Sequence, residues 1–264
     1  MKRLIRISVA AGLMVLLAAA VRSDIVAPHS GETHSAERME RLPPVMLWAW
    51  ERREDLSFID PDAVGVAALV GTVFLYDDAV AVRPRFQPLM VPPGTQVIAV
   101  VRIQANHARP ASLLPVQRAR TLRAIEHLAR GKVAALQIDF DATRSQRAFY
   151  RALLLDLRRD LPPTLPLSIT AIASWCIYDD WLATVPIDEA VPMLFRMGPD
   201  SGRVREYLAG GGDFRVAVAR RSLGIAIDEK LGNLPPRRRV YVFSPRAWSR
   251  DREAAALEGL KIWR

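Results

Sequence analysis

Cysteine and histidine are scarce in this 264-residue sequence, which argues against several kinds of chemistry. Cys176 is the only cysteine, so no disulfide can form within the chain. A cysteine nucleophile needs a histidine beside it, and the predicted folded part offers only His107 and His127, the second in the middle of a predicted helix. The four histidines include no pair at metal-ligand spacing. We therefore expect neither a cysteine nucleophile nor a zinc site.

Lysine is also rare, so the net charge of +9 comes almost entirely from arginine. The arginines are scattered along the chain and do not alternate with aromatic residues in any one stretch, as a base-stacking platform would require. The densest run, Arg237-Arg238-Arg239, follows two prolines and is interpreted as a solvated loop. The charge therefore predicts a basic surface rather than nucleic-acid binding.

Glycine-rich nucleotide motifs are missing as well. Trp48-Ala49-Trp50-Glu51-Arg52 stands after the first predicted strand, where a dinucleotide-binding protein has its glycine fingerprint. No P-loop occurs, and Gly210-Gly211-Gly212 follows a predicted helix, where it indicates the end of that helix. The sequence therefore predicts no cofactor.

The N-terminus has the pattern of a secretory leader. Lys2, Arg3 and Arg6 precede an uncharged run over residues 7–21, which ends near small residues suited to cleavage. We predict a signal peptide or membrane anchor over residues 1–21, a flexible linker over 22–42 and a single domain over 43–264. This organisation predicts a periplasmic or secreted protein, which contacts a membrane only through the leader if the leader stays uncleaved.

Short apolar runs alternate with amphipathic ones along the predicted domain, which indicates a parallel sheet with crossover helices. Strands are expected at 45–50, 65–68 with 72–76 nearby, 96–103, 134–141, 167–173, 190–195, 214–217 (with 224–227) and 240–244. Helices are expected at 115–130, 145–160, 179–185, 202–209 and 251–260. In the second helix, apolar residues recur at four-residue spacing from Phe149 to Leu161, so they predict one buried face.

This pattern predicts an α/β fold, a (β/α)8 TIM-like barrel that is irregular in its first third. Residues 58–93 show strand and loop character, with prolines at 84, 88, 92 and 93 and no helical periodicity. An open parallel α/β sheet is the alternative architecture.

The most informative stretch is 134–142, an apolar run that contains Asp139 and Asp141. Side chains alternate along a strand, so the two carboxylates share one face with Gln137, with Cα atoms roughly 7 Å apart. A carboxylate pair at the end of a buried strand is costly and is usually kept for proton transfer, sugar binding or a metal. An oxygen-only cation site at this pair stays open as an alternative.

The active site of a barrel lies where its strands end, so the strand ends supply the other candidates. Glu51 is the candidate second acid, and the expected substrate-binding residues are Trp50, Arg102, Gln104, Trp175 and Arg196. Acids, arginines and tryptophans in one mouth suit a carbohydrate, because indoles stack on sugar rings and charged groups bind hydroxyls. Paired acids also perform glycosidic cleavage.

Structural interpretations compete with several of these functional ones. Asp141 or Thr143 could cap the helix that follows. Arg196 ends a hydrophobic strand and needs an acid partner, for which Asp139 or Asp141 is expected. Asp228 and its neighbour are interpreted as a surface loop.

Three segments, residues 136–141, 167–176 and 191–198, resemble the signature segments of an uncharacterised family of exported bacterial proteins, catalogued as a domain of unknown function. The likeness covers Val45 to about Pro245 and implies a glycosidase-like TIM barrel without an assigned substrate. The chain is more distantly similar to family 18 chitinases, whose fourth strand carries Asp-x-x-Asp-x-Asp-x-Glu. Aligning its last aspartates with Asp139 and Asp141 puts Thr143 where that family has its catalytic glutamate.

The sequence thus leads to two functional hypotheses. The first is an exported glycoside-hydrolase-like protein acting on a polysaccharide through its strand-end carboxylates, with Glu51 as a possible proton donor. The second is a non-catalytic barrel that binds an envelope glycan or a protein partner, and it is motivated by Thr143 at the donor position.

Overall fold

The computed structural model describes residues 38–230 and 232–261. The predicted leader, and the predicted linker up to residue 37, lie outside the described residues. Residues 38–42, also assigned to the linker, begin with a helical turn, and Met39 and Leu42 pack into the same buried cluster as Met46 of the barrel. In the described part of the chain, no helix combines the length and the apolar character needed to cross a membrane.

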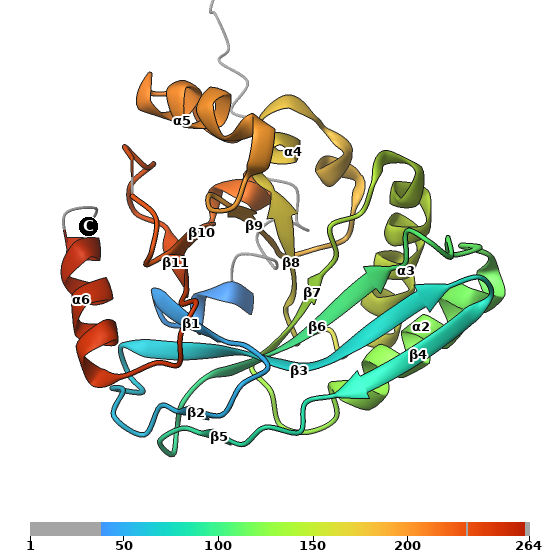
Figure 1. The fold of residues 1–264 in the computed structure, drawn as a ribbon, viewed down its shortest axis with the longest axis horizontal. Helices are drawn as coiled ribbons and strands as arrows, with labels where there is room; N and C mark the ends of the chain where they lie inside the picture. The colour runs from blue at the N-terminus through green and yellow to red at the C-terminus, as the bar shows by residue number, and fades with distance from the viewer. Residues whose placement is uncertain (1–37, 231, 262–264) are drawn as a thin grey trace, which may run out of the picture.

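The fold is a closed barrel, shown in Figure 1. Within the described residues, eight strands pair in parallel, each with its neighbours on both sides. In circular order they are β1 (Val45–Ala49), β3 (Val64–Tyr76), β6 (Val97–Ala105), β7 (Ala135–Asp139), β8 (Leu167–Ile172), β9 (Glu189–Met193), β10 (Ser222–Ala226) and β11 (Arg239–Phe243). Strand β1 pairs with both β3 and β11, which closes the circle. The predicted TIM-like barrel is confirmed, and the open sheet is wrong.

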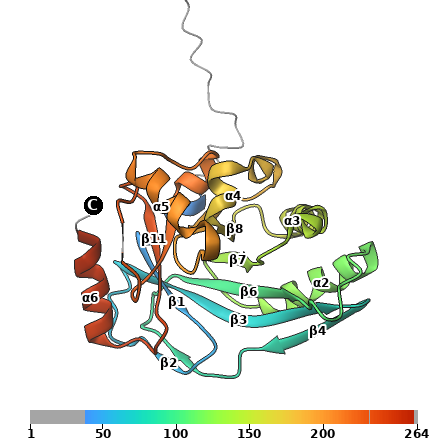
Figure 2. The ribbon, with the colours of Figure 1, turned by 45° about the horizontal axis from the view of Figure 1, so that its top comes forward.

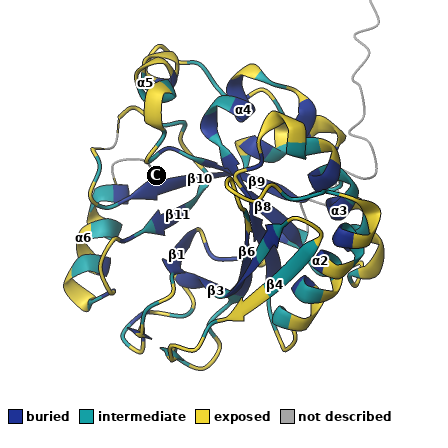
Figure 3. Cartoon of the chain, turned by 45° about the vertical axis from the view of Figure 1, so that its right-hand side comes forward, coloured by how far each residue is buried: buried dark blue, intermediate teal, exposed yellow. Residues whose placement is uncertain are grey.

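Helices cover the outside of most of the barrel (Figures 1 and 2). They are α2 (Pro115–Leu128), α3 (Arg147–Asp160), α4 (Ala173–Tyr178), α5 (Ser201–Ala209) and α6 (Arg250–Lys261). The predicted apolar face of α3 is buried, since Phe149, Leu153 and Leu157 are at most 5% exposed. Figure 3 shows the resulting layers, with buried strands inside and helices exposed on their outer faces.

The first third is irregular, as the sequence predicts. No helix stands between β1 and β6 in the described chain, where the short strands β2 (Glu54–Asp55) and β5 (Leu89–Met90) pair instead. Strand β3 joins the two runs predicted separately, with a bulge between Leu69 and Gly71. Its second half also pairs with the antiparallel β4 (Ala79–Pro84), so this hairpin extends past the barrel (Figure 1).

Two predicted elements after β8 are wrong. The described residues 214–217 form no strand, and Phe214 is buried in the helix–sheet core. A short apolar run has the same sequence pattern in a buried loop as in a strand, so the pattern could not distinguish them. Residues 179–185 contain only a 3-10 turn, η2 (Trp181–Thr184), and the Asp179 carboxylate precedes it, accepting the backbone N–H groups of Asp180 and Trp181 at 2.8 and 3.2 Å. The α-helix lies before it, as α4.

A chain of polar side chains crosses the barrel interior. The Trp48 indole N–H donates to Gln137 at 3.0 Å, and the Gln137 amide donates to the Ser168 hydroxyl at 3.2 Å. Ser168 and Tyr241 in turn donate to the Glu189 carboxylate at 3.2 and 2.7 Å. All five groups are buried and bonded, so these polar residues pack the interior without leaving the linked groups unsatisfied.

Candidate active site

A pocket of about 440 Å³ opens where the barrel strands end. Parallel strands bring their carboxyl ends to one rim, so residues distant in sequence meet there. Its lining consists of Trp48, Trp50, Arg102, Asp139, Asp141, Thr170, Ile172, Met193, Phe195, Arg196, Met197 and Phe243.

Asp139 is the last residue of β7 and lies at the floor of this pocket, 7% exposed. Strand register places Arg102 of β6 opposite Asp139, with 3.8 Å between the guanidinium Nε and a carboxylate oxygen. On the other side, the Thr170 hydroxyl of β8 donates to the other carboxylate oxygen at 2.7 Å. Burial and the nearby charge of Asp141 outweigh these two partners and raise the pKa of Asp139 to about 6.

Asp141 follows two residues later and is exposed at the rim of the pocket. The pocket walls around its carboxylate raise its pKa, and Arg102 opposes that rise. Since the charge of Asp141 disfavours ionisation of Asp139, the two carboxyls titrate as a coupled pair. In mildly acidic solution the pair can hold one proton, so that one carboxyl is protonated while the other stays ionised. Acid catalysis requires a group that is protonated at the working pH.

Aromatic rings form the opposite wall. Phe195 and Phe243 stack with ring centroids 5.4 Å apart and planes within 8°. Trp50 meets Phe243 edge to face at 6.4 Å, and the Arg102 guanidinium lies 5.6 Å from the Trp50 ring. Trp48 is 3% exposed and packs beneath, against Phe195. An apolar wall facing two carboxylates matches the mixed surface of a sugar ring.

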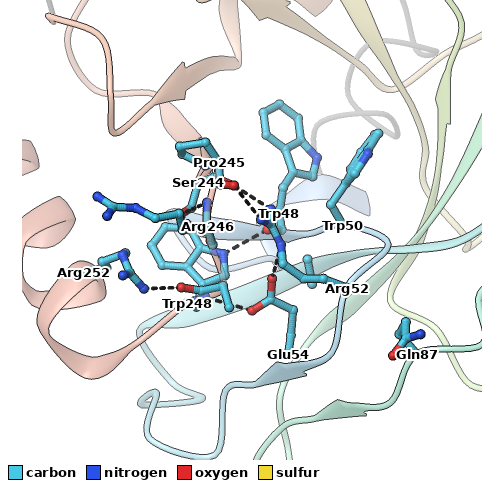
Figure 4. Close-up of polar contacts among 12 residues, drawn as sticks. Trp48, Trp50, Arg52, Glu54, Gln87, Ser244, Pro245, Arg246, Trp248 and Arg252 are labelled. Atoms are coloured by element: carbon cyan, nitrogen blue, oxygen red, sulfur yellow. Dashed lines mark hydrogen bonds and ion pairs between the residues drawn. The ribbon is translucent and has the colours of Figure 1, made fainter.

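The turn after β1, which carries Trp50, is fastened from below (Figure 4). The Arg52 guanidinium donates to the Ser244 carbonyl at 2.8 Å and lies 2.9 Å from the Glu54 carboxylate. Glu54 also accepts the backbone N–H of Trp248 at 2.8 Å, and the Trp248 indole donates to the Trp48 carbonyl at 2.9 Å. Burial raises the pKa of the Glu54 carboxyl, against the effect of these donors.

A second arginine holds the same turn from the loop after β4. The Arg85 guanidinium donates to the carbonyls of Ala49, Trp50 and Arg52, at 3.1 Å for the first and 2.5 Å for the third. Burial lowers the pKa of Arg85, against the charge of Glu54. With Arg52 and Arg85 bonded to backbone on both sides, the turn holds Trp50 in place at the pocket.

The structure brings together five of the eight predicted site residues: Asp139, Asp141, Trp50, Arg102 and Arg196. The other three lie outside the lining. Glu51 is exposed and accepts from Arg83 at 2.6 Å, and Gln104 is exposed on the part of β6 that continues along the β3–β4 hairpin. Trp175 lies in α4, because the chain turns into a helix immediately after Ile172.

Trp175 has a structural environment of its own. It is 7% exposed, meets Trp181 edge to face at 5.2 Å, and lies 5.3 Å from the Arg147 guanidinium. The ring is therefore part of the core between helices and sheet. The prediction that Trp175 lies at a strand end is therefore wrong, since Trp175 lies in α4.

The expected partner of Arg196 is also wrong. Its guanidinium pairs with Asp228 at 2.9 Å, and its backbone N–H donates to the Glu229 carboxylate at 2.9 Å. Arg196 has a φ of 51°, so the backbone turns sharply at the rim. The arginine beside Asp139 is Arg102, which the parallel register of β6 and β7 places there.

Thr143, rather than Asp141, begins the helical segment after β7. It is the N-cap of the 3-10 turn η1 (Arg144–Gln146), and its backbone N–H donates to the Gln146 side chain at 2.9 Å. Its hydroxyl lies 3.0 Å from that of Ser145.

Sequence reasoning missed part of the lining, chiefly Thr170, Met193, Phe195 and Phe243. A usable signal existed for Thr170, because Ser168 and Thr170 alternate with apolar residues in β8 and so point into the barrel. Phe195 and Phe243 follow or end hydrophobic strands and look like ordinary core residues in the sequence. Among the described residues, no group of three or more His, Cys, Asp or Glu could hold a metal ion.

Comparison with known proteins finds a match to one family model and a likeness to two solved structures. A family described as a domain of unknown function (DUF3142) matches residues 93–191, which contain β6, β7 and the aspartate pair. The chain is similar to the chitinase domain of the spore coat protein CotE from Clostridium difficile, with 12% identity and a TM-score of 0.42, over 73% of this chain and 67% of that one. It is also similar to a fungal endo-beta-N-acetylglucosaminidase of glycosyl hydrolase family 18, with 12% identity and a TM-score of 0.42, over 84% and 87% of the two chains. No curated protein matches the sequence.

Proposed function

We propose that this protein is a glycoside hydrolase that cleaves a polysaccharide in the pocket at the carboxyl ends of the strands. One observation carries the proposal: Asp139 and Asp141 lie side by side at a pocket with an aromatic wall, and the pKa of Asp139 is raised to about 6. A carboxyl that stays protonated in mildly acidic solution can donate to a leaving glycosidic oxygen. The neighbouring carboxylate can then stabilise the positive charge that develops on the sugar.

The environments of the two acids suggest how they divide these roles. Asp139 lines the pocket and has the pKa of about 6, so we assign it the transfer of the proton, with Thr170 and Arg102 orienting its carboxyl. Asp141 is exposed at the rim, so its carboxylate reaches the substrate directly, and we assign it the stabilisation of the positive charge on the sugar. Trp50 and Phe243 supply the stacking surface for the sugar ring.

A non-catalytic barrel that binds an envelope glycan or a protein partner is the second candidate, and two observations favour it. Thr143 caps a helical turn where a chitinase would have its acid. Within the part of the chain that the structure describes, the lining contains no carboxylate besides Asp139 and Asp141, and Glu51 is held outside it by Arg83. A binding barrel would keep the aromatic wall and the arginines but release no product.

The test is release of reducing ends from bacterial exopolysaccharides and cell-wall glycans by the purified protein. Asp139→Asn is expected to lower kcat/KM by about 100-fold or more, the usual contribution of a general acid. Activity is expected to decline above about pH 6, as the pair loses its shared proton.

Asp62→Asn is the matched control, because Asp62 is an exposed acid in the loop before β3, at the opposite end of the barrel. It is expected to keep full activity. Glycan binding that is weakened by Trp50→Ala, together with no product at high protein concentration, would replace the hydrolase by the binding barrel. Full activity in Asp139→Asn would rule out the proposed acid.

We also propose that the protein is exported, on the pattern of charged and apolar residues over 1–21. Cell fractionation combined with N-terminal sequencing of the protein tests this proposal. Recovery of the full-length protein in the cytosol would contradict it.

A further inference from the structure

A second cavity lies at the opposite end of the barrel, where the strands begin. It has a volume of about 810 Å³ and is lined by residues that precede or start β1, β10 and β11, together with Leu260 of α6. Its charged lining residues are five arginines and one acid, namely Arg220, Arg221, Arg237, Arg238, Arg239 and Glu40. We call this cavity the arginine pocket.

Carboxylates behind the lining compensate only part of this charge. Arg239 lies 2.7 Å from Glu189. A single carboxylate, Asp213, serves two arginines, with Arg238 at 2.6 Å and Arg220 at 3.8 Å. The compensation is therefore incomplete on the side of the pocket formed by residues 220 and 237–238.

Arg237 is the least engaged of the five. It is exposed, and it has neither a hydrogen bond nor an ion pair with the other described residues. It follows two prolines and has a φ of 59°, a conformation that a non-glycine residue adopts rarely. Such a strained position is typical of a functional turn.

Arg238 supplies an independent sign of a ligand. Its side chain is only 8% exposed, and its guanidinium carbon lies 5.5 Å from the centre of the Phe214 ring. One of its terminal nitrogens, Nη1, is buried and has no hydrogen-bond partner among the described residues. A buried charged donor without an acceptor is costly, so an acceptor brought by a ligand would remove that cost.

We propose that the arginine pocket binds a phosphate group. Guanidinium groups present planar pairs of donors that match phosphate oxygens, and several converging arginines bind one phosphate more strongly than isolated lysines do. Arg237 and Arg238 are the principal ligands, and Arg220 borders the same space. The site is independent of the proposed hydrolase, because it lies at the other end of the barrel.

The experiment is titration of the full chain with sodium phosphate, against sodium chloride at the same ionic strength, by calorimetry and thermal unfolding. The wild-type protein is expected to bind phosphate and to show a higher Tm in it. Arg237→Ala removes an exposed side chain without a partner, so the fold persists, and phosphate binding is expected to weaken about tenfold, as when a charge-assisted hydrogen bond is lost.

Arg53→Ala is the matched control, since Arg53 is exposed in the turn after β1 at the other end of the barrel. It should bind phosphate like the wild type. The proposal is overturned if phosphate and chloride act alike on the wild type, or if Arg237→Ala and Arg53→Ala bind phosphate equally well.

A second measurement identifies the source of the phosphate. Vesicles of phosphatidylglycerol and of phosphatidylcholine are sedimented with the wild type and with Arg237→Ala. Binding to the anionic vesicles alone, weakened in the variant, assigns the site to a lipid headgroup. Phosphate binding without vesicle binding assigns it to a soluble phosphate compound.

Discussion

The two ends of the barrel bury carboxylates in contrasting ways. At the end where the strands begin, Asp188 and Glu189 are at most 1% exposed. Asp188 accepts hydrogen bonds from Arg38 and from Arg158, at 3.0 and 3.2 Å, and Glu189 lies 2.7 Å from Arg239. At the end where the strands finish, Asp139 is also buried.

The compensation of Asp139 is much weaker. Its single side-chain hydrogen bond comes from the neutral Thr170 hydroxyl, and the only arginine beside it in the described chain is Arg102, at 3.8 Å. A second acid, Asp141, lies next to it instead of a further donor. Burial is thus similar at both ends, whereas the supply of positive donors differs.

This difference separates structural acids from candidate functional ones. A buried carboxylate with close arginines is neutralised and holds elements together. A buried carboxylate without them costs stability, and groups of this kind cluster at active sites. The comparison predicts opposite consequences for substitutions at the two ends.

The largest expected effect is at the start of the strands. Arg239→Met removes the arginine beside Glu189 and leaves the buried Glu189 carboxylate without its ion-pair partner. We therefore expect the free energy of unfolding to fall by about 3–5 kcal/mol. Urea denaturation at pH 7 measures the change. Arg109→Met breaks an exposed ion pair with Asp77 and is expected to cost at most about 1 kcal/mol. Equal losses in the two variants would contradict the distinction.

The next effect has the opposite sign and lies at the pocket. The pKa of Asp139 is raised in the folded state from 3.8 to about 6, so the folded protein keeps a proton that the unfolded chain loses. The resulting stability is fully present below about pH 4 and is lost as the pH rises through 6. Asp139→Asn removes this dependence.

We therefore expect Asp139→Asn to stabilise the protein at pH 7 by up to about 3 kcal/mol, and to have little effect at pH 4. Urea denaturation at both pH values measures it. A variant less stable than the wild type at pH 7 would show that Asp139 contributes to structure as Glu189 does.

The smallest effect concerns the one hydrogen bond to Asp139. Thr170→Val removes a donor that favours the charged carboxylate, so the pKa of Asp139 is expected to rise further, by roughly one unit. NMR titration of the carboxyl measures the shift. Thr121→Val is the control, because the Thr121 hydroxyl is buried in α2 and donates to a backbone carbonyl. The same shift in both variants would exclude the direct bond as the cause.

Local patterns were sufficient to predict much of the fold. The apolar run of β7 and the four-residue spacing in α3 correspond to a strand and a helix with the expected buried faces. The prediction failed where an apolar segment can bury its side chains in more than one backbone structure. Phe214 lies in a core loop instead of a strand, and Trp175 lies in a helix instead of at a strand end.

The candidate site was predictable only in part, for a similar reason. Alternation along β7 puts Asp139 and Asp141 on the face of Gln137 whatever surrounds the strand. Pairing between strands is not local, so Arg196 could not be distinguished from Arg102 as the arginine beside them. Glu51 follows its strand as expected, yet Arg83 of the β3–β4 hairpin holds it outside the pocket.

The sequence by itself determined the strand–helix alternation, the carboxylate pair and the scarcity of cysteine and histidine, because these depend on residue type and short spacing. The tertiary structure decided which arginine meets each acid, and it buried Asp139 beside Asp141, which raises the pKa of Asp139. It also placed Arg220 and residues 237–239 around one cavity, although the sequence predicted only a solvated loop for 237–239. Closure of the barrel sets these distances, and the energy of a charge depends on neighbours that only the closed barrel supplies.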